Sequence, residues 1–190
     1  MCFIDFKKAF DSVPHDALWI TMLDMGFPAH LVNLIMHLYK RQKAEVETAG
    51  VVSGWFTVMK GVRQGCVCHH IYLIRILLEA VMRETLDGYR WSTSSWRKTV
   101  TNLRYADNVV LIATSQSDLL ELVDRLNRAS QKYGLEINID KAKITTTQCM
   151  INNITINGTS VEKVETFTYF GSLFTQEVEY VKGIRLTLRH

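Results

Sequence analysis

The stretch from Leu103 to Ile112 places a carboxylate at the tip of an apolar hairpin. Apolar residues lead up to Ala106-Asp107-Asn108, and a run that begins with Val109 leads away from it. Because Asp and Asn tolerate turn dihedrals while Val, Ile and Leu favour a buried sheet, this pattern predicts two strands joined by a tight turn. A lone ionised carboxylate beside a buried sheet is costly unless a cation or strong donors compensate it. Asp107 therefore either serves only the turn, where Asp is common, or marks a functional site.

A second acidic tip lies at the start of the chain. The apolar run Phe3-Ile4 reaches Asp5, and the chain then turns towards Phe10. If this short strand lies beside the hairpin, Asp5 and Asp107 face each other at one end of the same sheet. Like charges so placed repel each other unless divalent cations lie between them, which is the protein half of a two-metal site. Magnesium suits such a site, because it takes one or two carboxylates and completes its shell with water and substrate phosphates.

The composition is that of one globular domain. A chain of 190 residues with 47% hydrophobic content can bury a single core, and ten glycines with two prolines argue against a linker-rich chain. The net charge of +3 permits a nucleic-acid binder without indicating one. No secretory signal opens the chain and no apolar run is long enough to span a bilayer. We therefore expect an intracellular protein with reduced cysteines and no membrane association.

Hydrophobic periodicity predicts the main elements. Helices are expected over about 14–23, 29–39, 67–85 and 117–133, and strands over 44–48, 55–59 and 135–139. A hairpin is expected over 151–164, around the turn Asn157-Gly158. Apolar spacing assigns two helix stripes to the core: Leu31, Leu34, Ile35 and Leu38, and Leu119, Leu122, Val123, Leu126 and Ala129. Either Ser115 or Ser117 can cap the last helix. The basic run 40–43 is either a solvated surface or a phosphate contact.

A glycine-flanked loop, Gly61-Val62-Arg63-Gln64-Gly65-Cys66, precedes the helix expected at 67–85. Glycines let backbone approach a ligand closely, and a helix N-terminus favours anions, although a loop can also simply need two glycines. The segment 66–70 holds two cysteines and two histidines. Ligands so close in sequence cannot all point at one tetrahedral ion, so we expect no zinc site there.

Five segments resemble, in order, the motifs of reverse transcriptases of the non-LTR retrotransposon type: FIDFKKAFD, GVRQGC, YADN, GLEINIDKAK and YFGS. They span Phe3 to about Ser172. Two departures stand out, because the family usually has YADD where Asn108 falls here, and Leu-Ser-Pro where Cys68-His69-His70 falls. The resemblance implies an α+β polymerase palm with an antiparallel ferredoxin-like sheet and helices on one face. It also implies one truncated palm domain over 1–190, with fingers-like helices within 14–43, a primer-grip region at about 150–175, and fingers and thumb largely missing.

The resemblance also implies a site. Two magnesium ions are expected on Asp5, Asp107 and the backbone carbonyl of Phe6, with Asn108 as a degenerate catalytic position. A lysine of this family would lie near the triphosphate and protonate the departing pyrophosphate; Lys141 matches it best, and Lys143 is its neighbour. The residues expected to bind the nucleotide are Phe6, Phe10, Arg63, Gln64, Gly65 and Tyr105, and those expected in the primer grip are Phe170 and Gly171.

The implied function is RNA-directed DNA polymerase activity, with an RNA template, a DNA primer and deoxynucleoside triphosphates as partners. Phe10 would exclude a ribose 2′-hydroxyl, unless it is simply a core residue. Because Asn108 removes a negative charge where two dications meet, we expect a rate loss on the order of a hundredfold or more. The alternative is an inactive palm remnant that binds nucleic acid or protein. A small-molecule enzyme on this fold would need a closed pocket.

Overall fold

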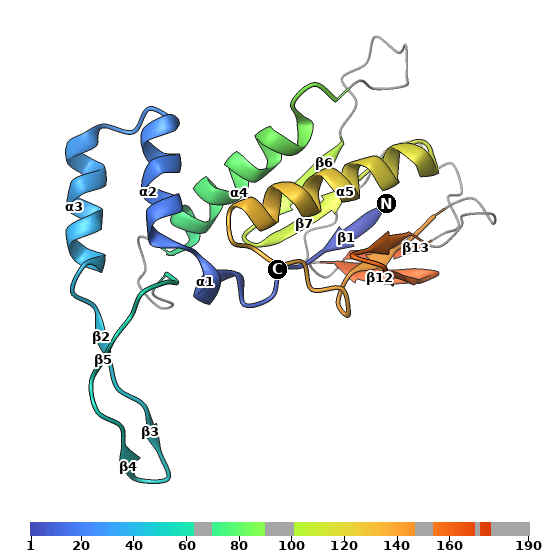
Figure 1. Cartoon of the computed structure of the whole chain (residues 1–190). Helices are drawn as coiled ribbons and strands as arrows, with labels where there is room; N and C mark the ends of the chain where they lie inside the picture. The colour runs from blue at the N-terminus through green and yellow to red at the C-terminus, as the bar shows by residue number, and fades with distance from the viewer. Residues whose placement is uncertain (63–69, 90–100, 147–153, 170–171, 176–190) are drawn as a thin grey trace.

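The computed structural model describes residues 1–62, 70–89, 101–146, 154–169 and 172–175 (Figure 1). Its helices are α1 (Ala9–Ser12), α2 (His15–Asp24), α3 (Ala29–Tyr39), α4 (His70–Leu86) and α5 (Gln116–Lys132). Its strands are β1 (Cys2–Ile4), β2 (Lys43–Ala44), β3 (Glu47–Thr48), β4 (Val51–Val52), β5 (Phe56–Thr57), β6 (Asn102–Tyr105), β7 (Asn108–Leu111), β8 (Lys143–Ile144), β9 (Thr155–Ile156), β10 (Thr159–Ser160), β11 (Glu162–Lys163), β12 (Thr166–Tyr169) and β13 (Ser172–Thr175).

The central sheet has five strands in the order β11-β8-β1-β7-β6. Strand β1 runs antiparallel to both of its neighbours, with Phe3 opposite Val110 in β7 and opposite Lys143 in β8. Strands β6 and β7 form the predicted hairpin, while β11 pairs with β8 in parallel. The prediction of an α+β architecture rich in antiparallel pairs is therefore confirmed, although the sheet contains one parallel pair.

The two faces of the sheet are covered by different elements. Ile4 and Leu111 belong to the main core, to which the buried residues of α4 and α5 also contribute. Neighbouring residues of a strand point to opposite faces, so Phe3 and Val110 lie on the other face. There the Phe3 ring lies 4.4 Å from the ring of Phe167 in β12, measured between centroids. Both faces near β1 are thus buried, which explains why its three residues are all apolar.

Helix α5 forms as its sequence predicts. The hydroxyl of Ser115 accepts a hydrogen bond from the backbone N–H of Asp118 at 3.1 Å, so Ser115 is the N-cap. The predicted stripe is buried over its whole length: Leu119, Leu122, Val123, Leu126 and Ala129. Gly134 follows the helix with φ of +74°, a conformation that suits glycine. The helix contacts α4 and β7 and so covers the sheet that carries the Asp107 hairpin (Figure 1).

The predicted buried face of α3 is wrong. Ile35 is buried, but Leu34 and Leu38 are 61% and 57% exposed and Leu31 is 37% exposed. The residues that face the core together with Ile35 are Val32 and Tyr39. This helix carries apolar residues on several of its faces, so spacing alone does not identify the buried face. The contact with α2 makes that choice.

Residues 43–57 form an arm that projects away from the sheet (Figure 1). The strand predicted over 44–48 is divided into β2 and β3, and the one predicted over 55–59 is shortened to β5. Strand β2 pairs with β5, and β3 pairs with β4, which lies outside both predicted strands. The expected strand at 135–139 is also not regular, because it makes only an isolated bridge between Ile137 and Phe6. The Asn157-Gly158 turn is confirmed, with φ of 51° and 79° between β9 and β10. Across the described ranges, no helix combines the length and hydropathy that crossing a membrane requires.

Candidate active site

Strand pairing brings Asp5 and Asp107 to the same edge of the sheet. Ile4 pairs with Val109 in the antiparallel β1–β7 ladder. Asp5 comes directly after Ile4, and Asp107 lies two residues before Val109 in the β6–β7 turn. In an antiparallel pair the end of one strand adjoins the start of the other. The two carboxyl groups, far apart in the sequence, therefore meet at one rim.

The two carboxylates interact electrostatically. Burial raises the pKa of the half-buried Asp107 above its usual range, and the negative charge of Asp5 raises it further. The N–H of Asp107 itself and the charge of Lys141 act in the opposite direction without cancelling the rise. The Asp5 side chain is only 18% exposed. A pair of acidic groups held together with limited solvent is an arrangement that favours a bound cation.

Lys141 is the cation closest to this pair among the described ion pairs. Its Nζ lies 3.0 Å from Oδ2 of Asp5. The hydrogen bond and charge of Asp5 raise the pKa of Lys141, and Asp107 contributes to that rise. Lys143 instead pairs with Glu162 on the adjacent strand. Lys141, the lysine that matches the family motif best, thus lies at the acidic pair, and its neighbour Lys143 does not.

Asn108 lies beside Asp107 as a neutral partner. Its side-chain N–H donates to Oδ1 of Asp107 at 3.3 Å. A carboxylate here would repel Asp107, whereas the amide holds it and still offers one uncharged oxygen as a ligand. Within the described residues, no three His, Cys, Asp or Glu side chains gather as a metal cluster.

Phe6 can act here only through its backbone, because its side chain is 3% exposed and belongs to the core. The N–H of Lys7 donates to Glu136 at 2.8 Å, and the N–H of Asn138 donates to Asp5 at 2.8 Å. These bonds flank the bridge between Phe6 and Ile137. In such a non-hydrogen-bonded pair the carbonyl of Phe6 points away from Ile137.

Phe10 lies next to the start of the glycine-flanked loop. Its carbonyl accepts a hydrogen bond from the N–H of Val62 at 2.7 Å. The ring is partly buried and packs against the core, so Phe10 contributes to the core. Tyr105 ends β6 just before the acidic turn and is 65% exposed. The other predicted contacts fall outside the described residues: Arg63, Gln64, Gly65, Phe170 and Gly171, together with Cys66, Cys68 and His69.

Both acidic tips contain a non-glycine residue with positive φ. Lys8, three residues after Asp5, has φ of 45°, and Ala106, directly before Asp107, has φ of 51°. Such conformations are costly for residues with a side chain and are found preferentially at functional sites. Sequence reasoning did not identify this strain, because neither residue type signals it. It also missed Asn138, whose contact with Asp5 is made by the backbone alone.

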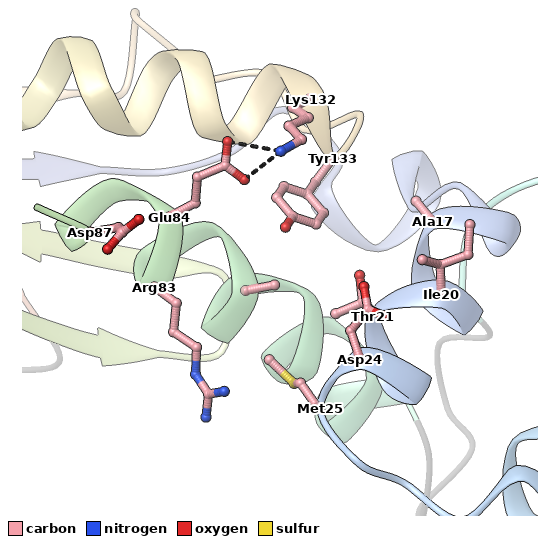
Figure 2. Close-up of a pocket in the computed structure, with 11 residues that line it drawn as sticks. Ala17, Ile20, Thr21, Asp24, Met25, Arg83, Glu84, Asp87, Lys132 and Tyr133 are labelled. Atoms are coloured by element: carbon pink, nitrogen blue, oxygen red, sulfur yellow. Dashed lines mark hydrogen bonds and ion pairs between the residues drawn. The ribbon is translucent and has the colours of Figure 1, made fainter.

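A pocket of about 840 Å³ lies elsewhere, between α2, α4 and the end of α5 (Figure 2). Glu84 and Lys132 form an ion pair at its side, with distances of 2.9 and 3.1 Å from Nζ of Lys132 to the two carboxylate oxygens. Tyr133 lies beside this pair, and burial followed by the charge of Glu84 raises its pKa. Asp5, Asp107 and Lys141 do not line this pocket. Because the acidic pair carries the chemistry, we place the candidate site there.

Comparison with known families decides the identity of this arrangement. The family model described as reverse transcriptase (RNA-dependent DNA polymerase) matches residues 1–174, which includes both acidic tips. The chain belongs to the reverse transcriptase family. This confirms the resemblance that the five ordered motifs indicated.

Curated relatives of this reverse transcriptase domain come from non-LTR retrotransposons. The Pol polyprotein of the type-1 retrotransposable element R2 of Nasonia vitripennis is 28% identical over 134 residues, which is 70% of this chain and 13% of the relative. The Pol polyprotein of the type-2 element R2DM of Drosophila melanogaster is 27% identical over 139 residues, which is 73% of this chain and 13% of the relative. The RNA-directed DNA polymerase of the mobile element jockey of Drosophila funebris is 24% identical over 198 residues, which is 100% of this chain and 21% of the relative. The chain thus spans about a fifth or less of the length of these relatives.

Proposed function

We propose that this reverse transcriptase domain is the palm of an RNA-directed DNA polymerase, with Asp5 and Asp107 as its catalytic metal ligands. One observation carries the proposal: two acidic side chains from distant segments meet at one sheet edge and interact electrostatically. The sheet would be ferredoxin-like, and residues 1–190 would form one palm domain with fingers-like helices within 14–43 and a primer grip near 150–175.

The side chains present fit magnesium. The donors around the rim are all oxygen: the carboxylates of Asp5 and Asp107, the carbonyl of Phe6 and the amide oxygen of Asn108. Hard cations such as Mg²⁺ prefer oxygen ligands, and a positive group already lies against Asp5 in the form of the Lys141 ammonium. Two bound magnesium ions would supply charge neutralisation and would lower the pKa of the primer hydroxyl.

The other residues of the site would position the substrates. Phe10 and Tyr105 would border the nucleotide. Arg63, Gln64 and Gly65 would bind it too, and they directly follow Val62, whose N–H donates to the carbonyl of Phe10. Lys141 would neutralise the triphosphate and give its proton to the departing pyrophosphate. Phe170 and Gly171 would hold the primer. The partners would be an RNA template, a DNA primer and deoxynucleoside triphosphates, which implies an intracellular location.

A specific observation favours a second candidate, an inactive palm remnant that binds nucleic acid or protein. Asn108 is neutral and bonds to Asp107, so the site lacks a negative charge that the family usually has. Electrostatic stabilisation dominates this kind of chemistry, so the loss would cost about a hundredfold or more in rate.

Primer extension distinguishes the two candidates. The assay compares the native chain with Asn108→Asp, each in Mg²⁺ and in Mn²⁺, on an RNA template with a DNA primer. We expect slow synthesis that Asn108→Asp accelerates by about a hundredfold, and we expect Asp5→Ala to abolish synthesis in both backgrounds. Absence of DNA synthesis by both chains would favour the inactive remnant. DNA synthesis that persists in Asp5→Ala would refute the assigned site.

A further inference from the structure

The backbone fixes the turn that carries Lys141 directly to the strand end that carries Asp5. The N–H of Asn138 donates to the carbonyl of Asp5 at 2.8 Å. The turn then closes through the N–H of Ala142, which donates to Asn138 at 3.0 Å, and Ala142 itself is fully buried. The backbone next to Lys141 is therefore held in place. Its side chain reaches the acidic rim from a fixed point.

The ammonium of Lys141 contacts Asp5 and acts on Asp107 through its charge. It lies 3.0 Å from Oδ2 of Asp5, and its charge also acts on Asp107 by lowering the pKa of that group. The nearby lysines have other partners, since Lys7 pairs with Glu136 and Lys143 with Glu162. The contact is thus specific to Lys141 and is not a general property of a basic surface.

The ammonium lies against a carboxylate oxygen of Asp5, the residue that is the proposed metal ligand. Two carboxylates and one ammonium give the rim a net charge of minus one, because Asn108 adds none. A dication and an ammonium on the same carboxylate repel each other. The Lys141 side chain is 69% exposed, so its head can move into water without leaving a cavity.

We propose that Lys141 is a built-in counter-ion that occupies the cation position at Asp5 until a divalent metal displaces it. This inference rests on the proposed metal-binding role of Asp5 and Asp107. It adds an order of events: metal entry releases the ammonium, and only the released ammonium can reach a triphosphate. Lys141 is in this respect a positioning residue. It lowers the affinity of the site for metal, and its ammonium becomes available to a triphosphate only when the metal is bound.

Manganese binding measured by electron paramagnetic resonance of the free ion tests the proposal without any catalytic readout. Lys141→Gln removes the competing charge, and we expect it to bind Mn²⁺ about three- to tenfold more tightly than the native chain. Lys143→Gln removes the same charge two residues away, where the partner is Glu162, and should change the affinity little. Lys141→Arg keeps the charge and should stay near the native affinity.

The outcomes separate this inference from the proposed function. If Mn²⁺ binding depends on Asp5 and Asp107 but Lys141→Gln behaves like Lys143→Gln, the counter-ion role is refuted and the metal site stands. The second case is that Asp5→Asn and Asp107→Asn leave Mn²⁺ binding unchanged, both in the native chain and in Lys141→Gln, or that neither chain binds Mn²⁺. That result refutes both the metal site and the counter-ion role. A second readout uses the native chain with ¹³C-labelled lysine. The Lys141 Cε resonance should shift on addition of Mg²⁺, and an unchanged resonance at saturation would overturn displacement.

Discussion

The backbone N–H of Val62 donates to the carbonyl oxygen of Phe10 at 2.7 Å, which ties the start of the glycine-flanked loop to the segment that follows Asp5. The preceding residue adds a second tie, since the N–H of Gly61 donates to Val13 at 2.8 Å. Backbone hydrogen bonds thus join two segments that lie about fifty positions apart in the sequence. Their relative position depends on how closely the chain can approach itself at Gly61.

Gly61→Ala should destabilise the protein by about 1–3 kcal/mol. Gly61 has φ of +93°, and an added Cβ would lie 3.0 Å from Cα and O of Asp11, backbone atoms that cannot rotate away. Urea denaturation measures the effect. Gly54→Ala is the matched control, because an added Cβ meets no atom within 4 Å there and φ is not positive. Equal stabilities for the two variants would show that the approach is not tight.

Asp107→Asn should stabilise the fold near neutral pH. The folded-state pKa of Asp107 is raised, first by burial and then by Asp5, so its ionised form weakens folding at pH values above that pKa. As the pH falls through the raised pKa and then below the ordinary value of 3.8, the carboxyl becomes neutral in both states. The gain in thermal midpoint should therefore be largest at pH 7 and disappear in acid. Asp124→Asn, at an exposed position of α5, is the control and should show no such trend.

Asn108→Asp should destabilise the metal-free fold by about 1 kcal/mol. The change replaces a hydrogen bond to Asp107 at 3.3 Å with repulsion between carboxylates. A divalent ion bound between them would offset that repulsion, so Mn²⁺ should restore the thermal midpoint of this variant more than that of the native chain. A chelator provides the reference condition. An Asn108→Asp midpoint that does not respond to Mn²⁺ would count against a cation at this position.

Ile35→Ala should cost about 2 kcal/mol or more, whereas Leu34→Ala should change stability by less than about 0.5 kcal/mol. The reason is burial, since Ile35 is 8% exposed and Leu34 is 61% exposed on the same helix. Denaturation midpoints of the two variants provide the comparison. A larger loss of stability for Leu34→Ala than for Ile35→Ala would show that the buried face is the one predicted from apolar spacing.

These contrasts show which features the sequence can predict. The buried stripe of α5 was predictable because most of the remaining positions of this helix are charged or polar, which leaves one possible inner face. In α3 only His30, Asn33 and His37 are polar, so apolar residues occur on several sides of the helix and the pattern does not choose a face. Contact with α2 chooses it, and that contact is a tertiary property.

The acidic rim shows the same division between local and tertiary information. The hairpin tip at Asp107 and the strand end at Asp5 were predictable, because turn residues and apolar runs are local signals. The family resemblance favoured Lys141 over Lys143, but the contact of Lys141 with Asp5 was not predictable from local signals. A turn closed by Asn138 and Ala142 brings this lysine to Asp5. Strain at Lys8 and Ala106 likewise follows from the folded turns and not from residue type.

Asp5 and Asp107 should share a divalent cation, and anomalous X-ray diffraction from crystals of the native chain soaked in excess Mn²⁺ can locate that ion. We expect an anomalous peak about 2.2 Å from a carboxylate oxygen of each residue, with the Lys141 ammonium moved away from Asp5. A peak that contacts neither residue, or carboxyl groups that point to opposite sides of the molecule, would refute the shared site.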